Sequence, residues 1–299
     1  MSPASIHPGT IVVGIDGSAP SQAALGWAAE QAGLEGRALT LVHAVTSAGL
    51  SYVDSYALDE EAALAAMSAA GRALLDQAVA VVEHQHPNVE VTTELAMADA
   101  REALLTHAEQ AALVVMGTRG RGPVARLVLG SVSAAVTSHA TCPVVVIRAH
   151  AARAGSGGIL VGVDGHGTSS AAVELAYTQA STRRLPLTVM YCVPDPSSLS
   201  HAPSVKPYDS PGLERERLVL DKSVDGLGER FPDVTVTLVV GRGAADECLM
   251  SLAPSMDMVV VGTHHRRSLL GRLLNPDVER SVLLHASCIV AVVPELRRG

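Results

Sequence analysis

The chain has 299 residues, about twice the ~150 residues that serve as a soft prior for one domain. Hydrophobic residues make up 48% and charged residues 17%, which excludes a disordered or fibrous chain. The net charge of −8 and the aromatic content of 2% argue against a nucleic-acid-binding surface, which needs cations for phosphates and often aromatic rings for bases.

The sequence carries no sign of export or membrane insertion. Residues 1–10 lack the basic stretch and apolar run of a secretory signal, and no apolar run reaches ~18 residues. Cys142, Cys192, Cys248 and Cys288 include no C-x-x-C pair, so we interpret them as buried apolar residues in a reducing compartment. We expect a cytoplasmic protein without a membrane span.

The chain contains one pattern twice. Residues 11–18 (IVVGIDGS) match residues 159–166 (ILVGVDGH) at an offset of 148 residues. Residues 115–118 (VMGT) match residues 260–263 (VVGT) at an offset of 145, so the second copy is three residues shorter in the irregular stretch after its second strand. Such self-similarity is typical of a duplicated domain.

We therefore predict two domains, 1–150 and 158–299, joined by an Ala-, Gly- and Ser-rich seam at 149–157. In chain order, the first copy predicts strands at 10–16, 39–45, 89–96, 112–117 and 143–147 and helices near 21–35, 58–84, 99–110 and 131–140. The second copy predicts strands at 158–164, 187–193, 234–241, 256–262 and 288–293. This alternation favours an open, doubly wound parallel α/β sheet, whose ligands bind beyond the carboxyl ends of its strands.

The segment after the fourth strand is rich in glycine and arginine. Residues 117–133 read GTRGRGPVARLVLGSVS. Its glycines permit close approach of the backbone to a ligand, and Arg119, Arg121 and Arg126 add positive charge. Ser131 is predicted to cap the following helix, whose first N–H groups would face the same anion. The pattern predicts a phosphate site; the alternative is that these glycines only end the strand and begin a surface loop.

Two further segments follow strands at the same edge. Asp16, after the first strand, is suited to a ribose hydroxyl or to Mg²⁺ through water; alternatively, Asp16 or Ser18 caps the next helix. Val45, after the second strand, offers backbone groups and an apolar wall to a base.

Several familiar sites are missing from the sequence. The two lysines, Lys206 and Lys222, lie outside any glycine loop, which excludes a Walker A motif, and no dinucleotide fingerprint follows the first strand. There is no zinc-protease helix, nucleophile elbow or paired-carboxylate motif. His139 and His285 fall at equivalent helix ends, where a C-terminal interaction explains them, so we assign neither a metal site nor a catalytic residue.

The spacing of Gly117, Gly120, Gly130 and Ser131 resembles the ATP-binding motif of the universal stress protein family. The VGID start and the CPVVV end of the first copy are similar to that family as well, and the resemblance covers essentially the whole chain as a tandem. It implies, in each copy, a Rossmann-like sheet of five parallel strands of the adenine nucleotide alpha hydrolase-like type. Family members commonly pair through their last strand, so a homodimer of tandem chains is expected.

The resemblance also implies an ATP site in the first copy, with Mg²⁺ near Asp16 as an option. The residues carried over to this nucleotide site are Gly14, Ile15, Asp16, Val45, Met116, Gly117, Thr118, Arg119, Gly120, Arg121, Gly122, Arg126, Gly130, Ser131, Val132 and Ser133.

The second copy departs from the family motif. His265 replaces the second glycine, and Asn275 and Pro276 replace Gly-Ser, which removes one backbone donor. At most a weak second site is expected there, and the residues that match are Asp164, Val193 and Gly262.

The leading hypothesis is an ATP-binding stress-response protein that acts through nucleotide-dependent conformation or partner binding. One alternative is a slow Mg²⁺-dependent ATPase that uses Asp16, although ATP binding alone supplies no acid–base chemistry. Another is a nucleotide-independent scaffold or holdase that uses the alanine-rich helix near 57–84.

Overall fold

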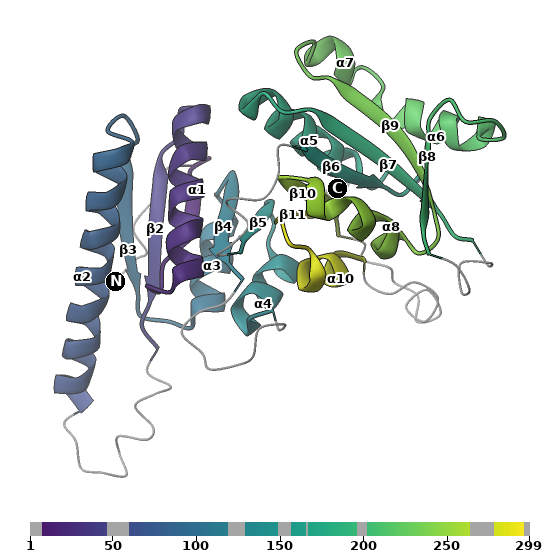
Figure 1. Ribbon diagram of the computed structural model, residues 1–299. Coiled ribbons are helices and arrows are strands. Elements are labelled where there is room, and N and C mark those ends of the chain that lie inside the picture. Colours follow the sequence, from purple (N-terminus) through teal and green to yellow (C-terminus); the bar gives the residue numbers. More distant parts are fainter. Residues whose placement is uncertain are drawn as a thin grey trace. The chain divides into compact units, whose positions relative to one another are not determined.

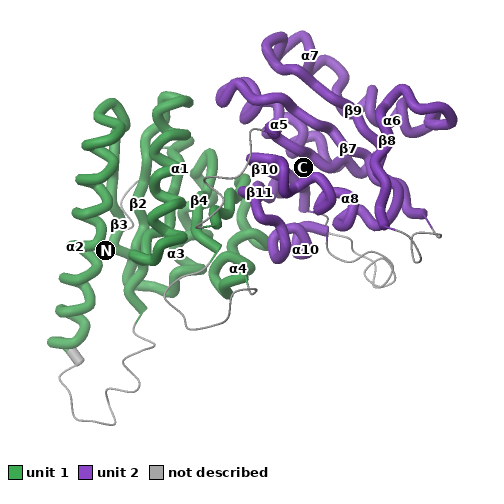
Figure 2. The backbone as a smooth tube through the Cα atoms, in the orientation of Figure 1, with its two compact units in different colours: residues 1–149 green, residues 150–299 purple. Residues whose placement is uncertain are grey.

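The computed structural model describes residues 8–46, 60–118, 129–148, 157–165, 167–195, 202–263 and 278–295. The chain divides into two compact units, residues 1–149 and residues 150–299 (Figure 2). Each unit contains one copy of the duplicated sequence pattern.

The first unit alternates strands and helices as the sequence predicts. Its strands are β1 (Ile11–Gly14), β2 (Leu39–Ala44), β3 (Val91–Ala96), β4 (Leu113–Gly117) and β5 (Val144–Ile147). Its helices are α1 (Ala19–Glu35), α2 (Glu60–Gln85), α3 (Ala100–Ala108) and α4 (Ser131–His139). The strands run parallel in the order β3-β2-β1-β4-β5, so the chain reverses its direction across the sheet between β1 and β4.

Helices cover both faces of this sheet (Figure 1). Helix α1 contacts α2, and α3 contacts α4, so the four helices form one pair on each face. The central strands are therefore apolar along their whole length: Ile11, Val12 and Val13 of β1 are fully buried. This confirms the predicted doubly wound α/β fold.

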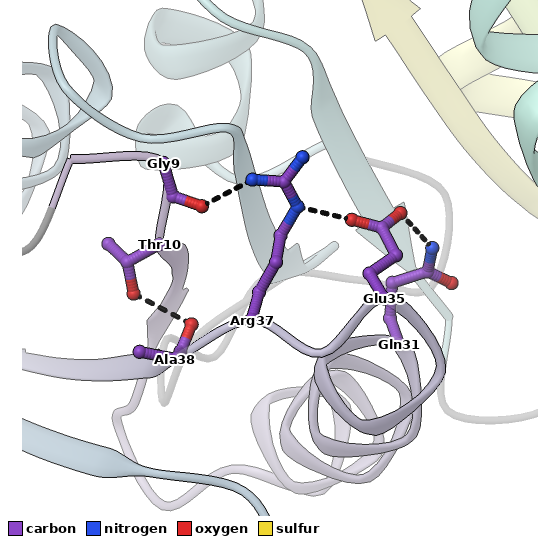
Figure 3. A network of polar contacts seen from close by, with 6 residues as sticks. All are labelled: Gly9, Thr10, Gln31, Glu35, Arg37 and Ala38. Carbon is purple, nitrogen blue, oxygen red and sulfur yellow. Dashed lines mark hydrogen bonds and ion pairs between the residues drawn. The ribbon is translucent and has the colours of Figure 1, made fainter.

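A polar network lies at the amino ends of β1 and β2 (Figure 3). The guanidinium of Arg37 donates to the carbonyl oxygen of Gly9 at 2.8 Å and to the carboxylate of Glu35 at 2.7 Å. The amide of Gln31 donates to the other oxygen of Glu35 at 2.6 Å. These contacts join the end of α1 to the chain before β1. They lie at the amino ends of the strands, opposite the carboxyl ends where such sheets bind ligands.

Helix α2 is long and largely apolar. Within the described residues, its segment 61–85 has the length and composition that would allow it to cross a membrane. Arg72 and Asp76 lie within this segment, so the sequence contains no uninterrupted apolar run there. In this fold, Leu75 and Val82 are buried, and the helix contacts β2 and β3 as a helix of a globular domain does.

The second unit repeats this plan with an additional edge strand. Its strands are β6 (Ile159–Val163), β7 (Leu187–Val193), β8 (Ser204–Pro207), β9 (Val236–Arg242), β10 (Met258–Gly262) and β11 (Ile289–Val293). Its helices are α5 (Ser170–Arg183), α6 (Glu214–Val224), α7 (Leu227–Arg230), α8 (Ala245–Leu252), the 3₁₀ helix η5 (Ala253–Ser255) and α10 (Val278–His285). The strand order is β11-β10-β6-β7-β9-β8.

The second unit contains the five expected parallel strands, β11-β10-β6-β7-β9, and one strand more than expected. Strand β8 pairs antiparallel with β9, with Lys206 opposite Val240. It arises from the irregular stretch in which the two copies differ in length. A short edge strand tolerates Pro207, because a strand with a single neighbour needs fewer backbone N–H donors than a central strand does.

Candidate functional site

The candidate site lies where the strand order of the first unit reverses. Strand β1 pairs with β4, with Val13 opposite Val115, so Ile15 and Gly117 come level at the carboxyl edge. Open α/β sheets bind ligands at this switch point. The segments after β1 and β4 are thus brought together, as the sequence predicts.

The turn after β1 is fixed by β2. The N–H of Ile15 donates to the carbonyl of Val42 at 2.8 Å, and Nδ1 of His43 lies 2.6 Å from the carbonyl oxygen of Ile15. Because that oxygen only accepts, Nδ1 carries the proton. The sequence analysis missed His43. The parallel register of β1 and β2 would have indicated it: Gly14 stands opposite Val42, so Ile15 and His43, the residues that follow them, are also neighbours.

Asp16 is held by two serines in this turn. Its N–H donates to Oγ of Ser21 at 3.2 Å, and its Oδ1 accepts from the N–H and hydroxyl of Ser18 at 2.9 and 2.6 Å. Ser18 is the N-cap of α1 and accepts from the N–H of Ser21. Of the two residues expected to cap this helix, Asp16 and Ser18, it is therefore Ser18 that does so. Within the described residues, Oδ2 of Asp16 accepts no hydrogen bond, and the side chain is half-buried.

The segment after β4 leaves the sheet and returns to it at one point. The N–H of Thr118 donates to Ile147 at 3.0 Å, and the N–H of Gly130 donates to the carbonyl of Thr118 at 2.9 Å. The buried hydroxyl of Ser133 donates to the carbonyl of Gly117 at 2.9 Å. These contacts close the base of a loop. Its predicted site residues Arg119, Gly120, Arg121, Gly122 and Arg126 lie outside the described residues.

The predicted cap of α4 is displaced by one residue. Gly130, not Ser131, is the N-cap: its backbone is extended (φ −61°, ψ 149°), and its carbonyl accepts the first helical bond, from Ala134 at 2.9 Å. A glycine brings no capping side chain, and the structure shows none bonded there. Within the described part of the chain, the N–H groups of Ser131 and Val132 have no acceptor, which leaves the positive end of the helix open to an anion.

Apolar side chains border the same edge. Ile15, Val45 and Met116 are each about 95% buried, so they pack into the core just beneath the carboxyl ends of the strands. The N–H of Val45 already donates to Ala96 at 2.8 Å, so this donor is not free for a base. The Cα of Gly14 faces Leu104, whose nearest atom would lie 3.3 Å from a Cβ built there.

In the equivalent turn of the second unit, both carboxylate oxygens of the aspartate accept hydrogen bonds from hydroxyl groups of the same turn. The N–H of Asp164 donates to Oγ of Ser169 at 3.0 Å, as Asp16 does to Ser21. Here, however, Oδ1 accepts from the Ser169 hydroxyl at 2.8 Å and Oδ2 accepts from the Thr168 hydroxyl. Each oxygen of this carboxylate therefore accepts a hydrogen bond from its own turn.

The other second-copy residues lie at the same edge. Gly262 ends β10, and Val193 ends β7, where its carbonyl accepts from Gly243 at 3.0 Å. The residues that break the family motif, His265, Asn275 and Pro276, lie outside the described residues.

Two predicted structural histidines occupy equivalent helix ends. Nδ1 of His139 lies 2.9 Å from the carbonyl oxygen of Ala135, and Nδ1 of His285 lies 2.9 Å from that of Ser281. Among the residues that the structure covers, no group of three or more His, Cys, Asp or Glu side chains is arranged to hold a metal ion.

Comparison with known proteins gives one consistent family. The profile of the universal stress protein family matches residues 8–148 and again residues 157–294. A universal stress protein of Mycobacterium tuberculosis is 32% identical over 300 residues, covering 95% of this chain and 96% of the relative. A second from that organism is 33% identical over 305 residues, covering 95% of each chain.

Solved structures show the same fold along the whole chain. A universal stress protein from Archaeoglobus fulgidus superposes with a TM-score of 0.68 at 14% identity, covering 96% of both chains. A putative universal stress protein from Pseudomonas aeruginosa gives a TM-score of 0.60 at 18% identity, covering 96% of this chain and 93% of the other. At such identities, the likeness concerns the fold.

Proposed function

The chain belongs to the universal stress protein family, and from that premise we propose that its first unit binds an adenine nucleotide, ATP, at the switch point between β1 and β4. One observation carries the proposal: the first turn of α4 presents N–H groups without acceptors in the described chain, at the base of a glycine- and arginine-rich loop. An uncapped helix N-terminus beside such a loop favours a phosphate group.

Each part of the nucleotide has a matching part of the edge. The phosphates would accept from the N–H groups of Ser131 and Val132 and from the Gly120 loop with its arginines. The ribose hydroxyls would donate to Oδ2 of Asp16. Adenine would lie over the apolar edge formed by Ile15 and Val45.

As the alternative to a ribose contact, Asp16 fits a magnesium ion that accompanies the phosphates. Its Oδ2 is a carboxylate oxygen without a partner in the described chain, and Mg²⁺ prefers such ligands, usually with several waters retained. When bound, the ion would neutralise phosphate charge. The chain's own contribution is to fix this oxygen through the Ser18 and Ser21 contacts.

We assign the second unit a structural role. Both oxygens of Asp164 already accept a hydrogen bond from a hydroxyl group of the same turn, whereas Oδ2 of Asp16 accepts none from the described chain, so Asp164 is the weaker acceptor for a ribose. The sequence differences at His265 and Asn275 point the same way. The protein then acts as a cytoplasmic stress-response regulator, paired as a homodimer, with nucleotide occupancy of the first unit as its signal.

The test is to purify the chain without added nucleotide, denature it, and identify and count what it releases by chromatography and mass spectrometry. About one adenine nucleotide per chain is expected. Two per chain would contradict the structural role of the second unit. None, even after incubation with Mg·ATP, would overturn nucleotide binding altogether.

A matched pair of variants locates the site. Gly120→Val places a branched side chain in the loop and is expected to abolish binding while the circular dichroism spectrum stays unchanged. His265→Val, at the corresponding position of the second unit, is expected to leave binding intact. Equal nucleotide binding by both variants would contradict the assignment of the phosphate site to the Gly120 loop.

A further inference from the structure

Two cysteines of the second unit meet over one glycine. Cys192 lies near the end of β7, opposite Gly241 of β9, and Cys248 lies on α8. A Cβ built on Gly241 would lie 3.0 Å from Sγ of Cys248 and 3.2 Å from Sγ of Cys192. Both sulfur atoms therefore border the same small space. The Sγ of Cys192 also lies 3.9 Å from the carbonyl oxygen of Ala245, in the first turn of α8.

The first unit has the same junction without sulfur. Ala44 at the end of β2 stands opposite Ala96 of β3, as Cys192 stands opposite Gly241. The offset of 145 residues places Ala103 of α3 at the position of Cys248.

The neighbouring contacts support this equivalence. Leu104, next to Ala103, approaches a Cβ built on Gly14 to 3.3 Å. Leu249, next to Cys248, approaches a Cβ built on Gly162 to the same distance.

Three positions thus differ together between the copies. Two alanines become cysteines, and the alanine between them becomes a glycine. A methyl group at position 241 would lie closer to both sulfur atoms than ordinary van der Waals contact allows, so Gly241 makes room for the pair.

The environment makes Cys248 the more acidic thiol of the pair. The hydrogen bond from Cys192 lowers the pKa of Cys248, while the same contact, together with burial, raises the pKa of Cys192. The first proton therefore leaves more readily than the second, because the remaining S–H stabilises the thiolate. Cys248 is fully buried and Cys192 is partly exposed, so small oxidants reach the pair from the side of Cys192.

We propose that Cys192 and Cys248 form an oxidisable dithiol that hydroperoxides convert into a disulfide. The hydroperoxide transfers one oxygen to one sulfur, which becomes a sulfenic acid, and is itself reduced to the corresponding alcohol, or to water when it is hydrogen peroxide. The other thiol then attacks that sulfur, the S–S bond forms, and the sulfenic oxygen leaves as water. Two thiols thereby lose two electrons and two protons to one peroxide. The bond joins β7, immediately before Val193, to α8.

The proposal is independent of nucleotide binding in the first unit. It differs from the interpretation of all four cysteines as inert apolar residues, which fits Cys142 and Cys288. Both are buried, and burial raises the pKa of the Cys142 thiol to about 11. These two cysteines therefore serve as internal controls.

The experiment treats the full-length reduced protein with hydrogen peroxide, blocks remaining thiols with N-ethylmaleimide, and maps the cysteines by mass spectrometry. Loss of two of the four thiols is expected, with a reducible cross-link between the tryptic peptides 185–215 and 243–266. The Cys142→Ala/Cys288→Ala variant should keep this cross-link. Cys192→Ala and Cys248→Ala should each lose it, and both introduce the residue that the first unit already tolerates.

A second probe tests proximity without oxidation. Phenylarsine oxide bridges two adjacent thiols, and it should protect Cys192 and Cys248 from N-ethylmaleimide until a competing dithiol removes it. Protection of neither would overturn the proposal. So would protection by the arsenical without a peroxide-induced cross-link, since the pair would then only be packed together. A cross-link that involves Cys142 or Cys288 would overturn it as well.

Discussion

Gly117 at the end of β4 lies directly against Pro20 at the start of α1. A Cβ built on Gly117 would stand 2.7 Å from both the carbonyl carbon and the Cβ of Pro20. At Gly262, the equivalent residue of the second unit, the nearest atoms stand 3.9 Å away. The first unit therefore depends on a glycine at this position for close helix–sheet contact, and the second does not.

We expect Gly117→Ala to lower the free energy of unfolding by about 1–3 kcal/mol, the usual cost of overpacking. Gly262→Ala should cost less than about 1 kcal/mol, since its methyl group meets only ordinary contacts. Urea denaturation of the two full-length variants measures the difference. Equal losses would contradict the contact.

A second prediction concerns the carboxylate of Asp16. Asp16→Asn keeps an oxygen that accepts from Ser18 but replaces Oδ2, which has no partner in the described chain, by a donor. A lost hydrogen bond to a charged group is worth about 1.5–3 kcal/mol, so the affinity for Mg·ATP should fall about 10- to 100-fold. Isothermal titration calorimetry measures the affinity.

The matched control for that variant is Asp164→Asn. Both oxygens of Asp164 are engaged by Thr168 and Ser169, so this change should leave nucleotide affinity unchanged. If Asp164→Asn weakened binding as much as Asp16→Asn did, the assignment of the site to the first unit would be wrong.

Much of the fold was predictable because its strands and helices are marked by composition. Short, continuous apolar runs such as residues 113–116 favour strands covered on both faces, and the duplication shows each such run a second time in the sequence. Strand β8 was not predictable, because its residues carry no apolar alternation and pair only once β9 provides an edge.

The parts of the site that follow from strand order were predictable, and the contacts that depend on register and helix placement were not. The placement of Asp16 and Gly117 at one edge follows from strand order. The contact of His43 with Ile15 and that of Ser133 with Gly117 depend on register and helix placement. The cap at Gly130 was misplaced because a cap is defined by its backbone conformation, and serine is the commoner cap residue.

A third prediction concerns pH. His107 on α3 is 5% exposed, and burial lowers its pKa below 6.5, although Glu94 opposes this shift. The unfolded chain then binds a proton more readily than the folded chain, so the neutral form's stability is fully present above pH 6.5. It is lost as the pH falls from there through the lower pKa of the folded state.

His107→Leu should remove this component, since leucine does not titrate. Leucine already occupies the equivalent position 252 of the second unit. Thermal unfolding at several pH values between 5 and 8 compares the two proteins. Stability curves with the same pH slope in both would show that another group is responsible.

The last prediction exchanges the caps of two equivalent helices. Asp99 is the N-cap of α3, and its Oδ1 accepts from the N–H of Arg101 at 2.9 Å and from Nε of Arg101 at 2.8 Å. Ala244 is the N-cap of α8 and has no side chain to accept. Asp99→Ala should cost about 0.5–2 kcal/mol, and Ala244→Asp should stabilise its unit by a similar or smaller amount.

Acid separates the cap of Asp99 from general packing. The hydrogen bonds from Arg101 lower the pKa of Asp99 from 3.8 to about 2, so the contribution of the charged cap persists above pH 3.8 and is lost as the pH falls through about 2. The Asp99 side chain is 44% exposed, so salt weakens the effect. Urea denaturation at pH 7 and pH 3 should therefore show the full cost of Asp99→Ala at pH 7 and a smaller one at pH 3. A cost independent of pH would mean that the aspartate stabilises α3 by a contact other than its charged cap.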